Sequence, residues 1–204
     1  MKLNFSIIVT LTPFLFSCYL WEEAYCSTSP VPLRETSDTL SVTNGGKWGK
    51  WGRAEFCYKG AYAIGFKLKV QSHYDRRIYK DDTTLNAIRL RCSDGHHITS
   101  TEGKRGDWKF FKFCSGKHLL KEFKLRVSKP KLFGDDTAAN NIMFRCTNGN
   151  VLHGDGYNWG EEGRWSPPCR KGICGLQTKV HQPGSLGSMD ITGLNDVRFF
   201  CCED

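Results

Sequence analysis

The residues best suited to chemistry in this sequence are acidic, and they recur in one pattern. Asp-x-Thr-x-x-Asn precedes a segment ending in cysteine three times: "DDTTLNAIRLRC" (81–92), "GDDTAANNIMFRC" (134–146) and "DITGLNDVRFFC" (190–201). Glycoside hydrolysis needs two carboxyl groups about 5–10 Å apart, and Ca²⁺ binds clustered Asp and Asn oxygens. Asp and Thr side chains equally accept backbone N–H bonds in turns. Because catalysis rarely needs three copies of one acid, we interpret the carboxylates as structural turn residues: Asp81, Asp82, Asp135, Asp136 and Asp190.

Three further acids do not recur, and they are the candidates for catalysis if any carboxylate is catalytic. Glu161 and Glu162 stand in the insertion "GEEG", and Glu102 stands in the second copy of the repeat. The sequence has no G-x-S-x-G or H-E-x-x-H motif and no C-x-x-C pair, so the usual nucleophile and zinc arrangements are absent. We therefore predict no catalytic residue, no metal site and no cofactor.

Aromatic residues offer a different chemistry, because exposed rings stack on sugars. Trp51, Trp108 and Trp165 each follow Gly-x and lie 57 residues apart, so we expect them to pack in the core or between sheets. Trp48 and Trp159 do not fit this spacing. With Tyr157, and with Glu161 and Glu162 beside them, they form the predicted glycan-binding site. The competing interpretation is that they are edge aromatics without a ligand.

These residues are positioned by an internal repeat of about 55 residues. Each copy contains the Gly-x-Trp segment, a cysteine, a strand-like segment ("FKLKV", "FKLRV" or "LQTKV"), the acidic turn and a strand that ends in cysteine. We assign residues 1–26 to a signal peptide, 27–43 to an N-terminal extension and 44–204 to one domain. The repeats within it span about 45–99, 100–153 and 154–204.

The strand-like segments alternate apolar and charged residues. In "FKLKV" the apolar positions are Phe66, Leu68 and Val70, and the lysines lie between them. A period of two residues is typical of a sheet with one buried and one solvated face. With 21 glycines between short segments and no sustained helical periodicity, the chain is predicted to be all-β.

The N-terminus predicts export. Lys2 precedes a mostly apolar stretch, and Ala24-Tyr25-Cys26 supplies small residues for cleavage. Removal of residues 1–26 leaves eight of the ten cysteines and takes Lys2, Glu22 and Glu23 away, so the formal charge rises from +8 to +9. An even cysteine number suits an oxidising compartment. We expect a secreted, extracellular protein that is not inserted in a membrane and does not bind nucleic acid.

Equivalence between the copies predicts the disulfides Cys57–Cys92, Cys114–Cys146 and Cys169–Cys201. Each would close a loop of about 30 residues, which is worth roughly 3 kcal/mol in the chain-entropy model. Cys174 and Cys202 have no counterparts in the other copies and are expected to pair with each other. The exchange Cys169–Cys202 with Cys174–Cys201 stays open, because spacing does not separate adjacent cysteines.

Five motifs in order resemble the vitelline membrane outer layer protein 1 family: "VTNGGKWGKWG" (42–52), "DDTTLNAIRLRC", "GDDTAANNIMFRC", "CGLQTKV" (174–180) and "LNDVRFFCC" (194–202). The resemblance covers about residues 42–202. It implies a β-prism of three four-stranded Greek-key sheets, one per repeat, around a pseudo-threefold axis, stabilised by disulfides.

The resemblance also implies a function. The founding member of the family is a structural component of the outer layer of the egg vitelline membrane, and it is associated with chito-oligosaccharide binding and a proposed lysozyme-like glycosyl transfer. We expect a secreted structural or binding protein of an extracellular coat or secretion, with N-acetylglucosamine-type glycans or matrix glycoproteins as partners. The alternatives are an enzyme acting on chito-oligosaccharides and a secreted venom or antimicrobial effector.

Overall fold

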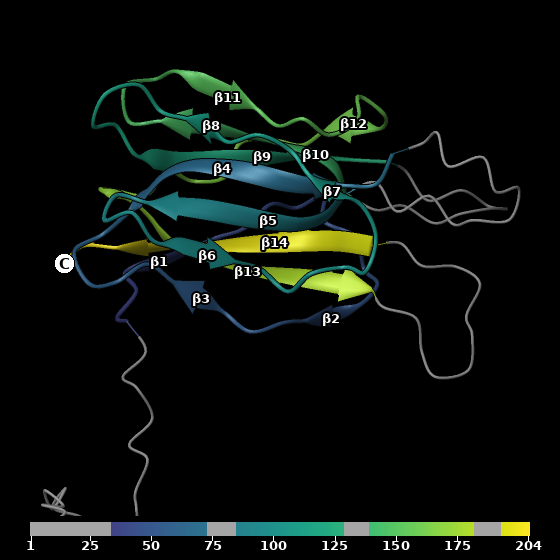
Figure 1. The fold of residues 1–204 in the computed structure, drawn as a ribbon, viewed down its shortest axis with the longest axis horizontal. Helices are drawn as coiled ribbons and strands as arrows, with labels where there is room; N and C mark the ends of the chain where they lie inside the picture. Colours follow the sequence, from purple (N-terminus) through teal and green to yellow (C-terminus); the bar gives the residue numbers. More distant parts are fainter. Residues whose placement is uncertain (1–33, 73–84, 129–138, 182–192) are drawn as a thin grey trace, which may run out of the picture. The chain divides into compact units, whose positions relative to one another are not determined.

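The computed structural model describes residues 34–72, 85–128, 139–181 and 193–204, which form antiparallel β-sheets (Figure 1). The long central strands are β4 (Ala63–Val70), β5 (Leu85–Cys92), β9 (Leu120–Val127), β10 (Ala139–Cys146), β13 (Gly172–His181) and β14 (Gly193–Cys202). The short strands are β1 (Asp38–Leu40), β2 (Lys50–Trp51), β3 (Glu55–Phe56), β6 (His97–Thr99), β7 (Asp107–Trp108), β8 (Lys112–Phe113), β11 (Val151–His153) and β12 (Glu161–Glu162). The predicted all-β class is confirmed. No membrane-spanning helix occurs in the part of the chain described here.

The strands form three sheets on one plan, with a long hairpin at the centre of each. Sheet A has the order β1-β14-β13-β2, with β3 also paired to β13. Sheet B has the order β6-β5-β4-β7, with β8 also paired to β4, and sheet C has the order β11-β10-β9-β12. This is the β-prism that the sequence resemblance implies.

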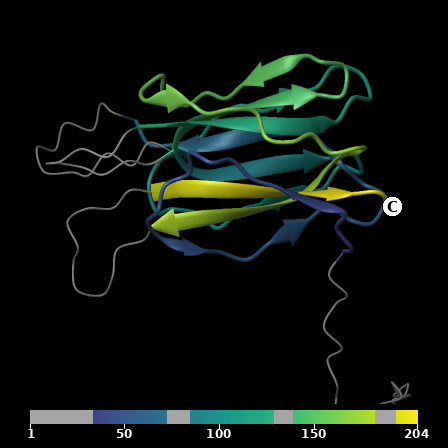
Figure 2. The same ribbon diagram turned by 180° about the vertical axis from the view of Figure 1, so that it is seen from behind.

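The edge strands cross the borders between repeats. Sheet B takes β7 and β8 from the second repeat, and sheet C takes β12 from the third. Sheet A is closed by β1, β2 and β3 from the beginning of the folded chain, and β1 runs beside β14 in Figure 2. The expectation of one sheet per repeat is therefore wrong at the edge strands. The stretch 27–43, assigned to an extension, supplies a strand that covers the backbone edge of β14.

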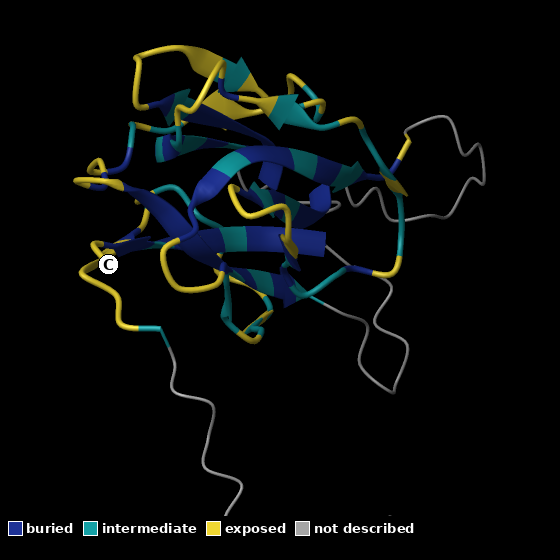
Figure 3. Cartoon of the chain, turned by 60° about the vertical axis from the view of Figure 1, so that its left-hand side comes forward, coloured by how far each residue is buried: buried dark blue, intermediate teal, exposed yellow. Residues whose placement is uncertain are grey.

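Alternation along the central strands places apolar side chains between the sheets. Phe66, Leu68 and Val70 are at most 2% exposed, while Lys67 and Lys69 between them are partly exposed. Figure 3 shows the same pattern, with buried segments along the central strands and exposed residues in the connections. The predicted faces of these strands are confirmed.

Four phenylalanines from the three sheets meet in the core, and each is fully buried. Phe144 of sheet C lies 4.6 Å from Phe66 of sheet B and 5.0 Å from Phe199 of sheet A, between ring centroids. Phe123 lies 4.7 Å from Phe199. Tilted and edge-to-face pairs of this kind add about 0.5–1.5 kcal/mol each beyond the burial of their area. The cluster joins the three sheets into one core.

The asparagine of the recurring motif lies at a β-bulge in each sheet. Lys69 pairs with Ala87 and Val70 with Leu85, so Asn86 is the extra residue of β5. Asn140 in β10 and Asn195 in β14 occupy the same place. All three are at most 2% exposed. Their backbone carbonyl oxygens accept hydrogen bonds of 2.7–2.9 Å from backbone N–H groups in the segments that precede β2, β7 and β12. The recurrence of this asparagine is therefore architectural.

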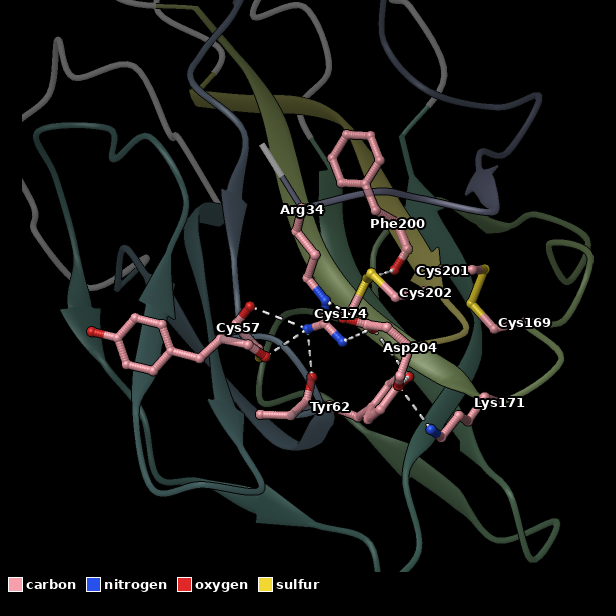
Figure 4. Close-up of a disulfide and its surroundings, with 12 residues drawn as sticks. Arg34, Cys57, Tyr62, Cys169, Lys171, Cys174, Phe200, Cys201, Cys202 and Asp204 are labelled. Carbon is pink, nitrogen blue, oxygen red and sulfur yellow. Dashed lines mark hydrogen bonds and ion pairs between the residues drawn. A yellow bond between two sulfur atoms is a disulfide. The ribbon is translucent and has the colours of Figure 1, made fainter. Parts of the chain in front are cut away.

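Four disulfides join Cys57 to Cys92, Cys114 to Cys146, Cys169 to Cys201 and Cys174 to Cys202. This is the pairing predicted from repeat equivalence, and the exchanged pairing of the adjacent cysteines is not found. Cys169–Cys201 and Cys174–Cys202 leave β14 on opposite sides of one hairpin (Figure 4).

Beside the last disulfide, Arg34 joins the two ends of the described domain (Figure 4). Its guanidinium donates to the carbonyl oxygens of Cys57, Tyr58 and Ala61 and forms a 2.5 Å ion pair with Asp204. The Arg34 side chain is only 6% exposed. Because its donors are satisfied on both sides, these charge-assisted hydrogen bonds offset the desolvation penalty of burying the guanidinium.

Several expectations concern residues outside the described ranges. These are the signal peptide at 1–26 and the five acidic turn residues Asp81, Asp82, Asp135, Asp136 and Asp190. Their roles stay predictions.

Candidate functional site

Three glycines of positive φ define equivalent positions at one end of the sheets. A Cβ on Gly49 would meet the backbone of Val180, and one on Gly106 would meet Val70. Gly160 stands in the same relation to Val127. Val70 and Val127 are the last residues of β4 and β9, and Val180 is the last but one of β13. The short strands β2, β7 and β12 follow the glycines at the same end of the domain in Figure 1. Only glycine fits here, because φ is positive and the neighbouring backbone is close.

This equivalence changes how the tryptophans align. The residues immediately before the three glycines are Trp48, Arg105 and Trp159. Trp48 and Trp159 therefore occupy the same position in sheets A and C, whereas the sequence spacing placed both outside the repeat. The counterpart of Trp51 and Trp108 in the third copy is Glu162. In the strand register, Glu162 lies opposite Arg126, as Trp51 lies opposite Lys179 in sheet A.

Trp51, Trp108 and Trp165 lie on the outer faces of the sheets, so the prediction that they pack in the core or between sheets is wrong. Each is partly exposed and has a guanidinium over its ring. The distances from Cζ to the ring centroid are 4.1 Å for Arg198 on Trp51, 4.4 Å for Arg89 on Trp108 and 4.2 Å for Arg145 on Trp165. A cation–π contact of this kind contributes about 0.5–2 kcal/mol. The inner positions are already occupied by the phenylalanine cluster.

Trp159 and Tyr157 form the most developed aromatic surface at this end of the domain. Their rings are stacked, with centroids 4.5 Å apart and planes 13° from parallel. Trp159 is 42% exposed. A stacked pair presents a broad apolar plane whose orientation is fixed by its partner ring, which is the surface that a pyranose ring needs.

The segment that carries Trp159 is held by hydrogen bonds from two side chains that the sequence analysis did not single out. Asn140 Nδ2 donates to the carbonyl oxygen of Trp159 at 3.0 Å and to Ser128 Oγ at 2.5 Å. Arg126 donates to the carbonyl oxygens of Asn158 and Gly160 at 3.2 and 2.9 Å. The recurring asparagine was the sequence signal for the first of these, but nothing in the spacing indicated Arg126.

Trp48 is a separate position rather than part of the same platform. It is 56% exposed and precedes β2 of sheet A, while Trp159 precedes β12 of sheet C. At the place that Tyr157 takes in sheet C, sheet A has Gly46, since both donate a backbone N–H to the bulge asparagine. Trp48 therefore lacks the stacked tyrosine, and of the three predicted aromatic residues Tyr157 and Trp159 are the two that stack on each other.

The two glutamates of the predicted site differ in their surroundings. Glu162 forms ion pairs with Lys124 and, at 2.5 Å, with Arg126. The hydrogen bond from Lys124 is the main cause of a lowered pKa of Glu162, with a further contribution from Arg126, and burial opposes both only in part. A general acid needs a raised pKa instead. Glu161 is exposed in β12 beside it.

Glu102 is also held by cations. Its carboxylate lies 3.0 Å from Lys69 Nζ and 3.8 Å from Arg89 on the outer face of sheet B. Within the described residues there is no group of three or more His, Cys, Asp or Glu side chains that could hold a metal ion. Near Trp159, the described residues therefore offer a stacked aromatic pair and a carboxylate whose ionised form is stabilised by two cations.

Residues 38–204 match the family model described as vitelline membrane outer layer protein I. The human vitelline membrane outer layer protein 1 homolog is 47% identical over 170 residues, covering 80% of this chain and 82% of the relative. The mouse homolog is 46% identical over 169 residues with the same coverage.

Solved structures with a similar fold include plant lectins. Calystegia sepium agglutinin gives a TM-score of 0.54 at 9% identity, covering 82% of this chain and 97% of the lectin. The artocarpin–mannotriose complex gives 0.51 at 12% identity, with 81% and 97% covered. At such identities the likeness concerns the fold alone.

Proposed function

We propose that this chain, which belongs to the vitelline membrane outer layer protein I family, is a secreted protein of an extracellular coat or secretion that binds glycans rich in N-acetylglucosamine. Four disulfides support export to an oxidising compartment. The prism shared with glycan-binding lectins supports a binding role by analogy of fold.

The observation that carries the proposal is the stacked pair Tyr157 and Trp159, in which the indole is exposed, the partly buried tyrosine packs against the core, and Asn140 hydrogen-bonds the backbone of Trp159. A sugar ring would stack on the exposed indole surface. Glu161 and Glu162 would accept hydrogen bonds from its hydroxyl groups. Trp48 is the weaker counterpart on sheet A, because it has no stacked partner.

The site residues favour binding over turnover. The two cations beside Glu162 stabilise its ionised form, so this group cannot keep a proton for the leaving group near neutral pH. The lysine and arginine instead order the carboxylate as a hydrogen-bond acceptor.

Titration calorimetry with chitotriose tests the proposal, using the oxidised mature protein and its Trp159→Ala and Trp48→Ala variants. Loss of one stacking ring costs about 1 kcal/mol or more, so Trp159→Ala is expected to weaken binding about fivefold or more. Trp48→Ala, at the weaker counterpart without a stacked ring, should change the affinity less than about twofold.

A turnover assay on the same oligosaccharide accompanies the titration. The proposal requires binding without cleavage or transfer. Product formation that Glu162→Gln abolishes would replace the binding role with the enzymatic one, and equal affinity of Trp159→Ala and the unmodified protein would refute the site.

A further inference from the structure

The outer face of sheet B carries a cluster of four cations, which we call the sheet B cationic face. Lys67 and Lys69 lie on β4, and Arg89 and Arg91 lie on the neighbouring β5 (Figure 1). Lys67 is directly opposite Arg89 in the register of the two strands. Like charges at directly opposed positions destabilise a sheet, so this arrangement has a cost that the fold itself does not require.

One described carboxylate, Glu102, lies within ion-pair distance of this cluster. It contacts Lys69 and, more distantly, Arg89. Lys67 Nζ instead lies over aromatic rings, 4.8 Å from the centroid of Phe111 and 5.3 Å from that of Trp108. Arg91 Nη1 hydrogen-bonds to His97 Nε2 at 2.8 Å. Within the described residues, Lys67 and Arg91 therefore have no carboxylate within 4 Å.

The other two sheets act as internal references, because the repeat places equivalent residues there. Sheet C has Met143 where sheet B has Arg89, and Glu122 pairs with Arg145 at 2.6 Å. Sheet A has Gln177 where sheet B has Lys67, and Phe200 where it has Arg91. Among the described residues, sheet A keeps two cations at the equivalent positions, Lys179 and Arg198, and the cations of sheet C form ion pairs with Glu122 and Glu162. Sheet B is the face that carries four, and the repeat does not explain this number.

Aromatic rings border the cationic face on one side. His97 stacks on Phe111 with centroids 5.2 Å apart, and Phe111 stacks on Phe113 at 5.4 Å. Phe113 is 49% exposed, and Phe110 in the same connection is 88% exposed. Apolar ring surface beside arginine and lysine can accept a ligand that has both flat apolar faces and anionic groups.

We propose that the sheet B cationic face binds a linear sulfated glycan. Guanidinium groups bind sulfate and carboxylate groups through paired hydrogen bonds. The stacked rings of His97, Phe111 and Phe113 would contact the apolar faces of the sugar rings that carry these anionic groups. Four disulfides place the protein in an oxidising compartment, where sulfated glycans are the abundant linear polyanions and nucleic acids are scarce. The site is independent of the Trp159 position.

His97 provides a reporter within the site. Burial is the main cause of its lowered pKa, and Arg91, Arg89, Lys67 and His96 add positive charge around it. A polyanion bound to the arginines would offset that charge, so the pKa of His97 is expected to rise when the ligand binds. An NMR titration of the His97 ring measures this rise directly.

The test is calorimetry of the full oxidised domain with a heparin-derived octasaccharide. Arg91→Gln and Lys67→Gln are each expected to weaken binding about fivefold or more, since each removes a charge-assisted contact. Arg53→Gln removes the same charge from a side chain that is 87% exposed between β2 and β3 of sheet A, where it pairs with Glu55 at 3.6 Å. This control should change the affinity less than about twofold. Thermal melts check that each variant is folded.

Three outcomes would overturn the proposal. One is an equal loss for Arg53→Gln, which would mean attraction by net charge alone. Another is equally tight binding of a desulfated octasaccharide or of a single-stranded oligonucleotide. The third is an unchanged His97 pKa in the presence of bound octasaccharide. None of these outcomes bears on chitotriose binding at Trp159, which Trp159→Ala tests separately.

Discussion

At the scale of single residues, the repeat separates architecture from specialisation. Asn86, Asn140 and Asn195 perform one task three times, at the bulge of each central hairpin. Glu162 does not, because it stands where the other sheets have a tryptophan. At this position sheet C has the ion-paired carboxylate of Glu162 in place of an aromatic ring. Glu162 pairs with Arg126, and Arg126 in turn donates hydrogen bonds to the backbone on both sides of Trp159.

The lowered pKa of Glu162 gives a pH-dependent contribution to stability. A folded-state pKa below the unfolded value of about 4.3 stabilises the fold above that value, and the contribution is lost as the pH falls through the folded pKa. Glu162→Gln should therefore lower the free energy of unfolding at pH 7 by no more than about 1 kcal/mol, given the partial exposure of the pair. Urea titrations from pH 7 to 3 measure the difference. The curves of the two proteins should converge at low pH, and a constant gap would exclude the ion pair as the cause.

Residue patterns predicted much of the fold but only part of the site. The alternation in "FKLKV" gave the correct faces of β4, because period-two burial is local. The tryptophans were misplaced because Gly163-Arg164-Trp165 resembles Gly49-Lys50-Trp51, although Gly160 is the structural equivalent of Gly49. The correct alignment of the third copy depends on which residues pair between neighbouring strands and on which glycine has a positive φ. The spacing of residues in the sequence shows neither.

At the scale of elements, most of the short strands matter because they complete a sheet that is built from another part of the sequence: β7 and β8 in sheet B, β12 in sheet C, and β1, β2 and β3 in sheet A. β1 covers the edge of β14 through three residue pairs, and Leu40 at its end is 2% exposed. An uncovered edge exposes unpaired backbone groups and favours association between molecules.

Truncation tests the contribution of β1. A chain beginning at Val42 lacks both β1 and Arg34, and it is expected to unfold at least about 2 kcal/mol more easily and to self-associate, since it loses Leu40 burial and a buried ion pair. A chain beginning at Arg34 is the control and should match the full mature protein. Urea unfolding and light scattering measure the two effects. Equal stability of both chains would show that β1 is dispensable.

At the scale of the whole molecule, the sheets share both strands and core. Phe66, Phe144 and Phe199 come from three different sheets, and the ring of Phe144 contacts both of the others. Arg34 forms an ion pair that joins the beginning of the domain to Asp204. No sheet can lose its packing without exposing the inner face of the next. We expect the domain to unfold as one unit.

The outer tryptophans report on the three sheets separately. Variants that keep one of Trp51, Trp108 or Trp165, with the remaining tryptophans replaced by phenylalanine, should show coincident fluorescence transitions in urea. Removal of a guanidinium from the ring on unfolding supplies the signal. Transitions separated by more than the experimental error would show that the sheets unfold independently, contrary to a shared core.

Glycan binding at the prism end is the central functional claim, and an ¹H–¹⁵N NMR titration with chitotriose tests it most directly through the indole N–H signals. The account predicts that the signal of Trp159 shifts with the sugar concentration. Those of Trp51, Trp108 and Trp165, which lie under guanidinium groups on the outer faces, should stay in place. A titration in which the Trp159 signal does not move, or in which only the outer-face tryptophans respond, would contradict it.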